Sequence, residues 1–265
     1  ISVGAPPDSF FADGQDWGFP PPLPAALHAS GHRLWRHLIE RVGRHADMLR
    51  IDHAMAVHRL WWVPDGMSPT QGVYVQYPRA EILTVIAASA AAADVTIVGE
   101  DLGTVPTDVS DAFERWDMLG MYEEQFHLDD DPLPHIPRRT VAGIRTHDME
   151  PIAELLATAD TSAYRTRLGT AHGCDIADNW ADVVENMLIR LAWSDAYLVS
   201  ADLDDLLGER RPHNLPGRVG PELWSRRLDR PTSETLDDPQ VRRLLEILAR
   251  RHHDAGGRPD DTSTT

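Results

Sequence analysis

The chain has 265 residues, of which 42% are hydrophobic and 25% are charged, so it can bury a substantial core. This composition excludes a disordered chain. The formal net charge of −17 argues against a surface for nucleic acid or anionic membranes, because such surfaces need clustered Lys and Arg. The arginines here are dispersed among acidic residues, and a neutral or cationic ligand fits better.

The sequence offers no sign of a disulfide scaffold, a metal site or another cofactor. Its one cysteine, Cys174, has no partner within the chain, and no Cys/His cluster has metal-ligand spacing. The acidic run 129–131 lacks the spaced ligands and turning glycine of a calcium loop, so we expect a solvated loop there. No apolar run approaches the ~18 residues of a membrane span, and no signal segment is evident. We expect a cytoplasmic protein.

Hydrophobic periodicity predicts strands and helices in alternation, which is typical of repeated βα units. Strands are predicted over 46–51, 95–98, 120–127, 141–145 and 196–200. Helices are predicted over 30–45, 79–93, 150–158, 180–193 and 237–251, with a further helix beginning near Pro106. A long loop is expected between the first strand and the helix 79–93, and residues 252–265 are expected to form a polar, disordered tail.

This order of elements indicates an α/β fold. A complete (β/α)8 barrel needs around 250 residues, but long loops consume much of this chain. We therefore predict that residues 1–251 form a partial catalytic (β/α)8 TIM barrel, the later part of a longer protein whose first strands lie upstream. An open doubly wound sheet is the alternative fold.

Three acidic residues each follow a predicted buried strand, namely Asp52, Glu100 and Asp148. A single Asp in such a place is commonly a helix cap. All three, from different βα units, would meet at the carboxyl ends of the strands, where α/β enzymes place their chemistry. The neighbours Arg50, His53 and His147 are suited to binding polar ligands.

Two carboxylates that face each other across a cleft can cleave a glycosidic bond, one attacking the anomeric carbon and the other donating a proton to the leaving oxygen. Asp52 and Glu100 fit this pair, and Asp148 fits a third group that stabilises the positive charge of the transition state. Arg50 lies two residues before Asp52, on the same side of its strand, and would keep that carboxylate ionised. Asp101 either assists Glu100 or caps the following turn.

Six segments of the chain form distinct motifs, and they are Gly4-Ala5-Pro6-Pro7-Asp8, Gly14-Gln15-Asp16-Trp17-Gly18, Leu49-Arg50-Ile51-Asp52-His53, Gly99-Glu100-Asp101-Leu102-Gly103, Thr146-His147-Asp148 and Asn214-Leu215-Pro216-Gly217. These motifs resemble, in the same order, those of the 4-α-glucanotransferases, also called amylomaltases or disproportionating enzymes, of glycoside hydrolase family 77. They cover nearly the whole chain except its tail. The first two are specific to the glucanotransferases, whereas the Arg-x-Asp and His-Asp pairs are shared with amylases at large.

The resemblance implies catalytic roles for the three acids. Asp52 would be the nucleophile that forms a covalent β-glucosyl enzyme, Glu100 the general acid/base and Asp148 the transition-state stabiliser, with retention of configuration. The implied substrate-binding residues are Arg50, His53, Asp101 and His147 near the cleavage site, Asp8, Gln15 and Trp17 in a loop that closes over the glucan, and Asn214 on the donor side.

The implied donors are α-1,4-glucans and maltooligosaccharides, and the implied acceptors are a glucan, glucose or maltose. Two alternatives stay open, an α-1,4-glucan hydrolase with the same acids and an inactive, truncated glucan-binding remnant. The chain departs from the family at Ala54-Met55-Ala56, where a glycine is frequent, and at Phe19, where many members have Asn; both bear on acceptor preference. A hydride-transfer enzyme is disfavoured because no Gly-x-Gly-x-x-Gly follows a strand.

Overall fold

The computed structural model describes residues 1–8, 11–103 and 105–254. The chain divides into two compact units, Ile1–Met121 and Tyr122–Thr265. The partial barrel domain that we expect over 1–251 stays a prediction.

The first unit contains an antiparallel sheet with the strand order β2-β1-β4-β5. Its strands are β1 (Ser2–Ala5), β2 (Gln15–Asp16), β4 (Arg59–Val63) and β5 (Val73–Gln76). The prediction of a long loop between the strand 46–51 and the helix 79–93 is therefore wrong where β4 and β5 form. A cross-strand aromatic pair stabilises this hairpin, because Trp61 lies opposite Tyr74 with ring centroids 4.9 Å apart.

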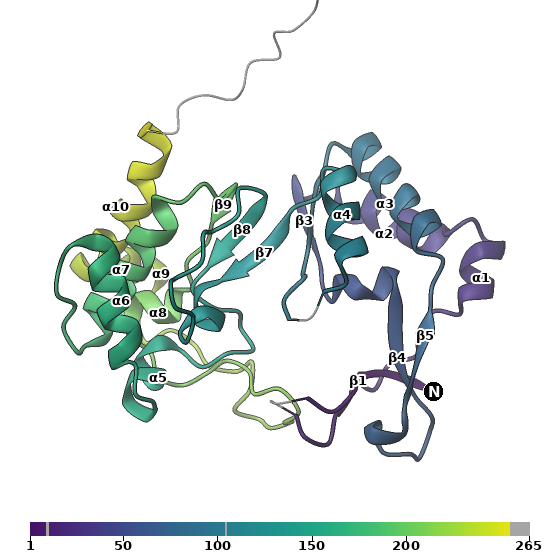
Figure 1. Ribbon diagram of the computed structural model, residues 1–265, viewed down its shortest axis with the longest axis horizontal. Coiled ribbons are helices and arrows are strands. Elements are labelled where there is room, and N and C mark those ends of the chain that lie inside the picture. Colours follow the sequence, from purple (N-terminus) through teal and green to yellow (C-terminus); the bar gives the residue numbers. More distant parts are fainter. Residues whose placement is uncertain (9–10, 104, 255–265) are drawn as a thin grey trace, which may run out of the picture. The chain divides into compact units, whose positions relative to one another are not determined.

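The same unit contains a parallel pair of strands, β3 (Met48–Ile51) and β6 (Thr96–Gly99), in which Ile51 lies opposite Gly99. Its helices are α1 (Pro24–Ala29), α2 (Arg33–Val42), α3 (Arg79–Ala93) and α4 (Thr107–Arg115), and α2 packs beside α3 (Figure 1). A Cβ on Gly99 would lie 2.2 Å from the Phe113 ring, so this glycine lets α4 pack closely against β6. The predicted strands 46–51 and 95–98 and the helix 79–93 are confirmed, with small shifts at the strand ends.

The second unit places helices against a sheet with the order β7-β8-β9, and Figure 1 shows the helices gathered on one side of these strands. The strands are β7 (Gly120–Glu123), whose last two residues belong to this unit, β8 (Thr140–Gly143) and β9 (Leu198–Val199), of which β8 and β9 are parallel. The helices are α5 (Ile152–Thr158), α6 (Ser162–His172), α7 (Trp180–Ala192), α8 (Leu203–Leu207), α9 (Thr232–Leu236) and α10 (Pro239–Asp254). Helix α7 is central, because Met187, Leu188 and Leu191 are fully buried in the core.

Several boundaries differ from the expectation. The strand predicted over 120–127 ends at Glu123 and continues as a 3₁₀ turn. Helix α6 was not expected, because its sequence has little amphipathic pattern. It ends at His172, and the following Gly173, with a φ of 69°, caps it. Helix α10 extends to Asp254, so the first three residues of the predicted tail are helical, and residues 255–265 lie outside the described residues.

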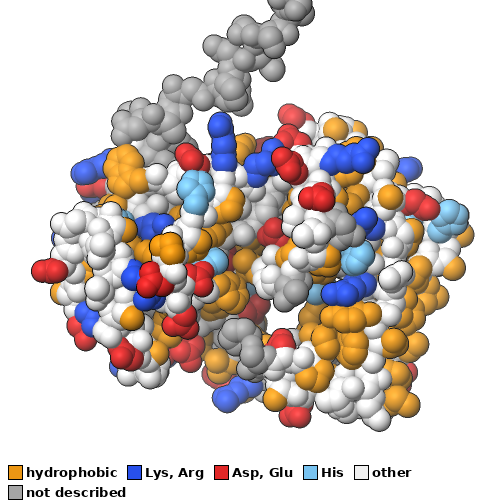
Figure 2. Space-filling model, in the orientation of Figure 1, with side chains coloured by type: hydrophobic (Ala, Val, Ile, Leu, Met, Phe, Trp, Pro, Cys, Tyr) orange, Lys and Arg blue, Asp and Glu red, His pale blue; other side chains and the backbone are white. Residues whose placement is uncertain are grey.

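Acidic and basic side chains intermingle on the face shown in Figure 2, which agrees with the dispersed arginines of the sequence. Asp129, Asp130 and Asp131 are exposed, as expected for a solvated loop. Among the described residues, none of the helices has the length and apolarity needed to span a lipid bilayer.

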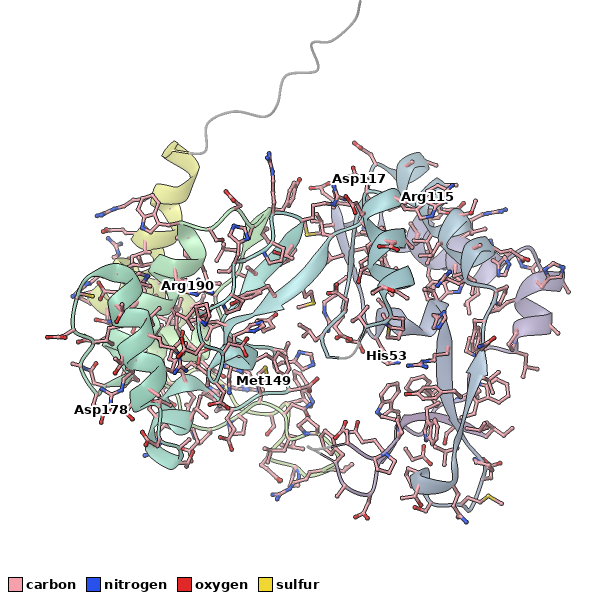
Figure 3. The ribbon with its side chains drawn as sticks, viewed as in Figure 1. His53, Arg115, Asp117, Met149, Asp178 and Arg190 are labelled. Atoms are coloured by element: carbon pink, nitrogen blue, oxygen red, sulfur yellow. The ribbon has the colours of Figure 1, made fainter. Side chains whose placement is uncertain are left out.

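A buried carboxylate organises the core of the second unit. Glu124 is fully buried and accepts hydrogen bonds from the hydroxyl groups of Tyr122 and Tyr164, at 3.0 and 2.9 Å. The guanidinium of Arg190 on α7, labelled in Figure 3, completes the set with an Nε–Oε1 distance of 2.9 Å. This network links the segment after β7 to α6 and α7.

Replacing Glu124 with Gln should lower the free energy of unfolding by about 3 kcal/mol, because it leaves the part-buried guanidinium of Arg190 without its counter-charge and removes a fully buried carboxylate. Glu185→Gln is the matched control, since it removes the partner of the exposed Arg243 and should change stability little. Urea denaturation of both variants checks this. Equal effects of the two substitutions would contradict the structural role of Glu124.

Candidate active site

The first acid stands where β3 ends. Asp52 directly follows this strand, and Arg50, two residues earlier, donates from Nη1 to its Oδ1 at 2.5 Å. The Asp52 side chain is 76% exposed, so a ligand can reach it. Arg50 also lies 3.2 Å from Met121 Sδ through its Nε. The expected placement of Arg50 beside Asp52 is confirmed.

The second acid lies next to the first because of the parallel strand pairing. Glu100 follows β6, and its N–H donates to the carbonyl of Ile51 at 2.8 Å. Its side chain turns back over the residues after β3, where Oε2 accepts the His53 backbone N–H at 2.8 Å. Oε1 accepts the N–H of Leu102 at 3.0 Å. Both oxygens of Glu100 are thus held beside the Asp52–His53 turn.

His53 joins this pair to the loop that carries Trp17. Its backbone is left-handed, with a φ of 44°, and its ring contacts Trp17 edge-on at a centroid distance of 5.2 Å. Burial lowers the pKa of His53, although the charges of Glu100 and Asp52 oppose this shift. The imidazole is therefore neutral near pH 7 and can donate or accept a hydrogen bond. Figure 3 labels it.

The remaining candidates of this unit have local partners. Gln15 Oε1 accepts from the Trp17 indole Nε1 at 3.3 Å, and Asp8 Oδ1 accepts the Phe11 N–H at 2.6 Å. Asp101 instead faces backbone: its Oδ1 accepts the Met121 N–H at 2.8 Å. Burial raises the pKa of Asp101, and the Met121 hydrogen bond opposes this.

Gly120 makes the close approach of Asp101 possible, because a Cβ there would lie 2.6 Å from the Asp101 carboxylate. Asp101 thus joins the segment after β6 to the start of β7. This contact gives it a structural role, and its expected role in binding substrate stays a prediction.

In the second unit, the third acid follows β8. Asp148 is 48% exposed, and its Oδ1 accepts from Asn214 Nδ2 at 2.5 Å, although the two residues are 66 positions apart. His147 Nε2 lies 3.5 Å from the same oxygen, and the His147 ring contacts Trp224 at 5.4 Å. The structure thus brings together Asp148, His147 and Asn214, the three sequence-predicted residues of this unit.

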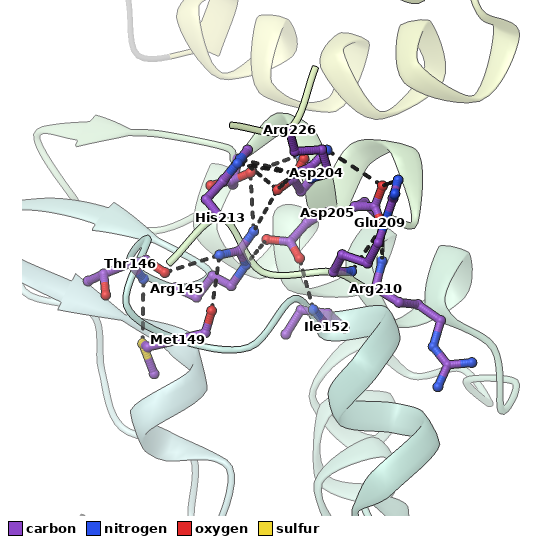
Figure 4. A network of polar contacts seen from close by, with 12 residues as sticks. Arg145, Thr146, Met149, Ile152, Asp204, Asp205, Glu209, Arg210, His213 and Arg226 are labelled. Atoms are coloured by element: carbon purple, nitrogen blue, oxygen red, sulfur yellow. Dashed lines mark hydrogen bonds and ion pairs between the residues drawn. The ribbon is translucent and has the colours of Figure 1, made fainter. Parts of the chain in front are cut away.

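A buried ionic network around Arg145 was missed by the sequence analysis (Figure 4). The Arg145 side chain is 1% exposed and donates from Nε to Asp205 Oδ2 at 2.8 Å. Asp205 Oδ1 accepts the Ile152 N–H at 2.9 Å. Burial raises the pKa of Asp205 to about 6, and the charge of Arg145 opposes this. The only signal in the sequence was a run of acids, Asp202, Asp204 and Asp205, after the last strand.

Two groups of described residues have the side-chain types of metal ligands. In the first, Glu81 Oε2 accepts from both His28 and His32 at 2.8 Å. In the second, which contains Asp202, Asp204 and His213, the guanidinium of Arg226 already bonds Asp204. Hydrogen bonds account for both groups, and we assign a metal to neither.

Comparisons with known proteins agree on one family. The family model described as 4-alpha-glucanotransferase, glycoside hydrolase family 77, matches residues 1–233. The 4-alpha-glucanotransferase of Mycobacterium bovis is 34% identical over 253 residues, covering 82% of this chain and 35% of the relative. That of Haemophilus influenzae is 33% identical over 175 residues, covering 65% of this chain and 25% of the relative. The chain therefore spans about a third or less of these relatives.

Solved structures show the same fold. The amylomaltase of Corynebacterium glutamicum superposes with a TM-score of 0.82 at 23% identity, covering 93% of this chain and 42% of that one. The amylomaltase of Streptococcus agalactiae, solved in complex with acarbose, gives a TM-score of 0.82 at 22% identity, covering 95% and 50%. On the family match over residues 1–233, this chain belongs to the 4-alpha-glucanotransferases of glycoside hydrolase family 77.

Proposed function

We propose that this chain carries the catalytic acids of a 4-α-glucanotransferase, which moves α-1,4-glucan segments from a donor to an acceptor glucan, glucose or maltose. The observation that carries the proposal is the side-by-side placement of two carboxylates in different settings: Asp52 is exposed and paired with Arg50, while Glu100 is held by backbone N–H groups. Family membership supports the substrate class. A cytoplasmic location stays a prediction.

The proposed reaction has two displacements. An Asp52 oxygen attacks the anomeric carbon, the bond to the leaving oxygen breaks, and Glu100 donates a proton to that oxygen. An acceptor hydroxyl then attacks the same anomeric carbon, and the bond from this carbon to the Asp52 oxygen breaks. The hydroxyl proton passes to Glu100, which restores both carboxyl groups. Each oxygen of Glu100 accepts one backbone N–H, and a carboxyl oxygen has two lone pairs, so Glu100 can keep these bonds while its O–H donates to the glycosidic oxygen.

We propose binding roles for the remaining candidates. Arg50, His53 and His147 would contact the sugar at the cleavage site, and Asn214 would orient Asp148 as it stabilises the transition state. Asp8, Gln15 and Trp17 would cover the bound glucan, where the Trp17 ring excludes water and so favours transfer over hydrolysis. We further propose that the two units are the later βα units of a (β/α)8 barrel, which the partial coverage of the amylomaltase structures supports.

Incubation with maltotriose tests the activity directly. A transferase should produce a ladder of longer glucans together with glucose or maltose, because each glucosyl intermediate is passed to another sugar. Chromatography by size resolves these products. Shortening alone would indicate the hydrolase, and binding of maltotriose without turnover would indicate the glucan-binding remnant.

Asp52→Ala and Glu100→Gln should each lower turnover by about 10³-fold or more, because each removes a group that acts on the reacting bond. Glu114→Gln, an exposed acid on α4, is the control and should leave turnover unchanged. Added azide should restore cleavage by Asp52→Ala, since it can attack from the side where the carboxylate stood and yield a β-glycosyl azide. Near-normal activity of either variant would refute its assigned role.

Asp148→Asn should lower kcat by about 10²-fold while changing KM little, because the lost charge stabilises the transition state more than the bound substrate. Steady-state kinetics with maltotriose measures both constants. A rise in KM with an unchanged kcat would assign Asp148 to substrate binding alone.

A further inference from the structure

Arg145 holds the turn that carries Asp148 through hydrogen bonds to the backbone of that turn. From Nη1, Arg145 donates to the carbonyl of Thr146 at 3.1 Å and to that of Met149 at 3.3 Å (Figure 4). These two carbonyls bracket His147 and Asp148. Because Arg145 is itself buried and paired with Asp205, it gives the turn a rigid support.

Asp204, which neighbours Asp205 on α8, contacts a second segment of the chain through His213. The ring Nε2 of His213 lies 2.7 Å from Asp204 Oδ2, and Asp204 Oδ2 lies 3.9 Å from Arg145 Nη2. The His213 ring also stacks on the Trp224 ring, with an interplanar angle of 8°. The backbone carbonyl of His213 accepts the Trp224 N–H at 2.9 Å. His213 is therefore held by its ring and by its backbone.

The residue after His213 is Asn214, whose amide donates to Asp148. An Asn side chain on a loop has several rotamers, and its contact with Asp148 requires a fixed backbone beneath it. The partners of His213 supply that fixation. Two segments thus hold Asp148, the turn that Arg145 supports and the His213–Asn214 segment. Both are connected to the same acids, Asp204 and Asp205.

We infer that His213, anchored by Asp204, is a positioning residue that sets the Asn214 amide against the Asp148 carboxylate. The positioning itself rests on the contacts above. Its effect on catalysis rests on the proposed function. His213 is placed to act through Asn214 rather than on the reacting atoms.

The test is the solvent exchange of the Asn214 side-chain amide protons in the ¹⁵N-labelled chain, with their resonance assigned by its loss in Asn214→Ala. His213→Phe keeps a ring to stack on Trp224 but removes the ring nitrogen that bonds Asp204. Exchange should become about tenfold faster in this variant, because the Asn214 amide is released to solvent. His213→Gln, which retains an N–H for Asp204, should restore most of the protection.

Glu154→Gln is the matched control, because it breaks the Glu154–Arg210 ion pair at the edge of the same network and removes no contact of His213 itself. It should leave the exchange unchanged. Parent-like exchange in His213→Phe would overturn the inference whether or not the chain turns over glucans. Loss of protection in Glu154→Gln as well would overturn it too, since loosening of the whole unit would then explain the effect.

Kinetics separates positioning from a general structural role. His213→Phe should lower kcat about tenfold with KM within twofold of the parent, and in the Asn214→Ala background it should cause no further loss. Additive losses in that double variant would contradict action through Asn214. If the parent produces no glucan ladder, the proposed function fails, and the exchange measurement still decides the positioning.

Discussion

The parallel register of β3 and β6 is the constraint on which the candidate site of the first unit depends. With Ile51 opposite Gly99, the next residue of each strand is a carboxylate, so Asp52 and Glu100 leave the sheet side by side. Each of the two carboxyl groups has its own polar partners. Arg50 is the partner of Asp52, and the N–H groups of His53 and Leu102 are the partners of Glu100.

The three acids stand in different surroundings, which suits a mechanism that needs different behaviour from chemically similar groups. Asp52 is the most exposed of the three and is paired with Arg50. Glu100 is held against backbone. Asp148 is held at one oxygen by the amide of Asn214, which fixes its direction without adding charge.

Buried charge has a structural purpose in the second unit. Arg145 and Asp205 are almost wholly buried, and burial of such groups is costly unless partners satisfy them. Here the partners are the backbone groups of the turn before Asp148 and of the start of α5, so the ion pair holds the loop that carries Asp148 in place. Glu124 and Arg190 similarly join α6 and α7 to the segment after β7.

Local pattern was a good guide where a segment is stabilised by its own burial. Helix α3 matches the predicted 79–93, and α7 ends one residue before the predicted 180–193, because each has many apolar residues for packing against its neighbours. The hairpin of β4 and β5 was missed because its pairing includes β1, more than fifty residues away, and turn residues such as Pro64, Gly66 and Gly72 suggested a loop.

The sequence by itself determined that Asp52, Glu100 and Asp148 follow strands, and that Arg50 lies beside Asp52, because alternation along a strand is a local property. Only the tertiary structure decided that Asn214 contacts Asp148, that Asp101 supports the backbone near Gly120, and that Arg145 with the acids of α8 forms a buried network. Those contacts join residues 20 to 66 positions apart, and no spacing or periodicity encodes which distant side chains meet.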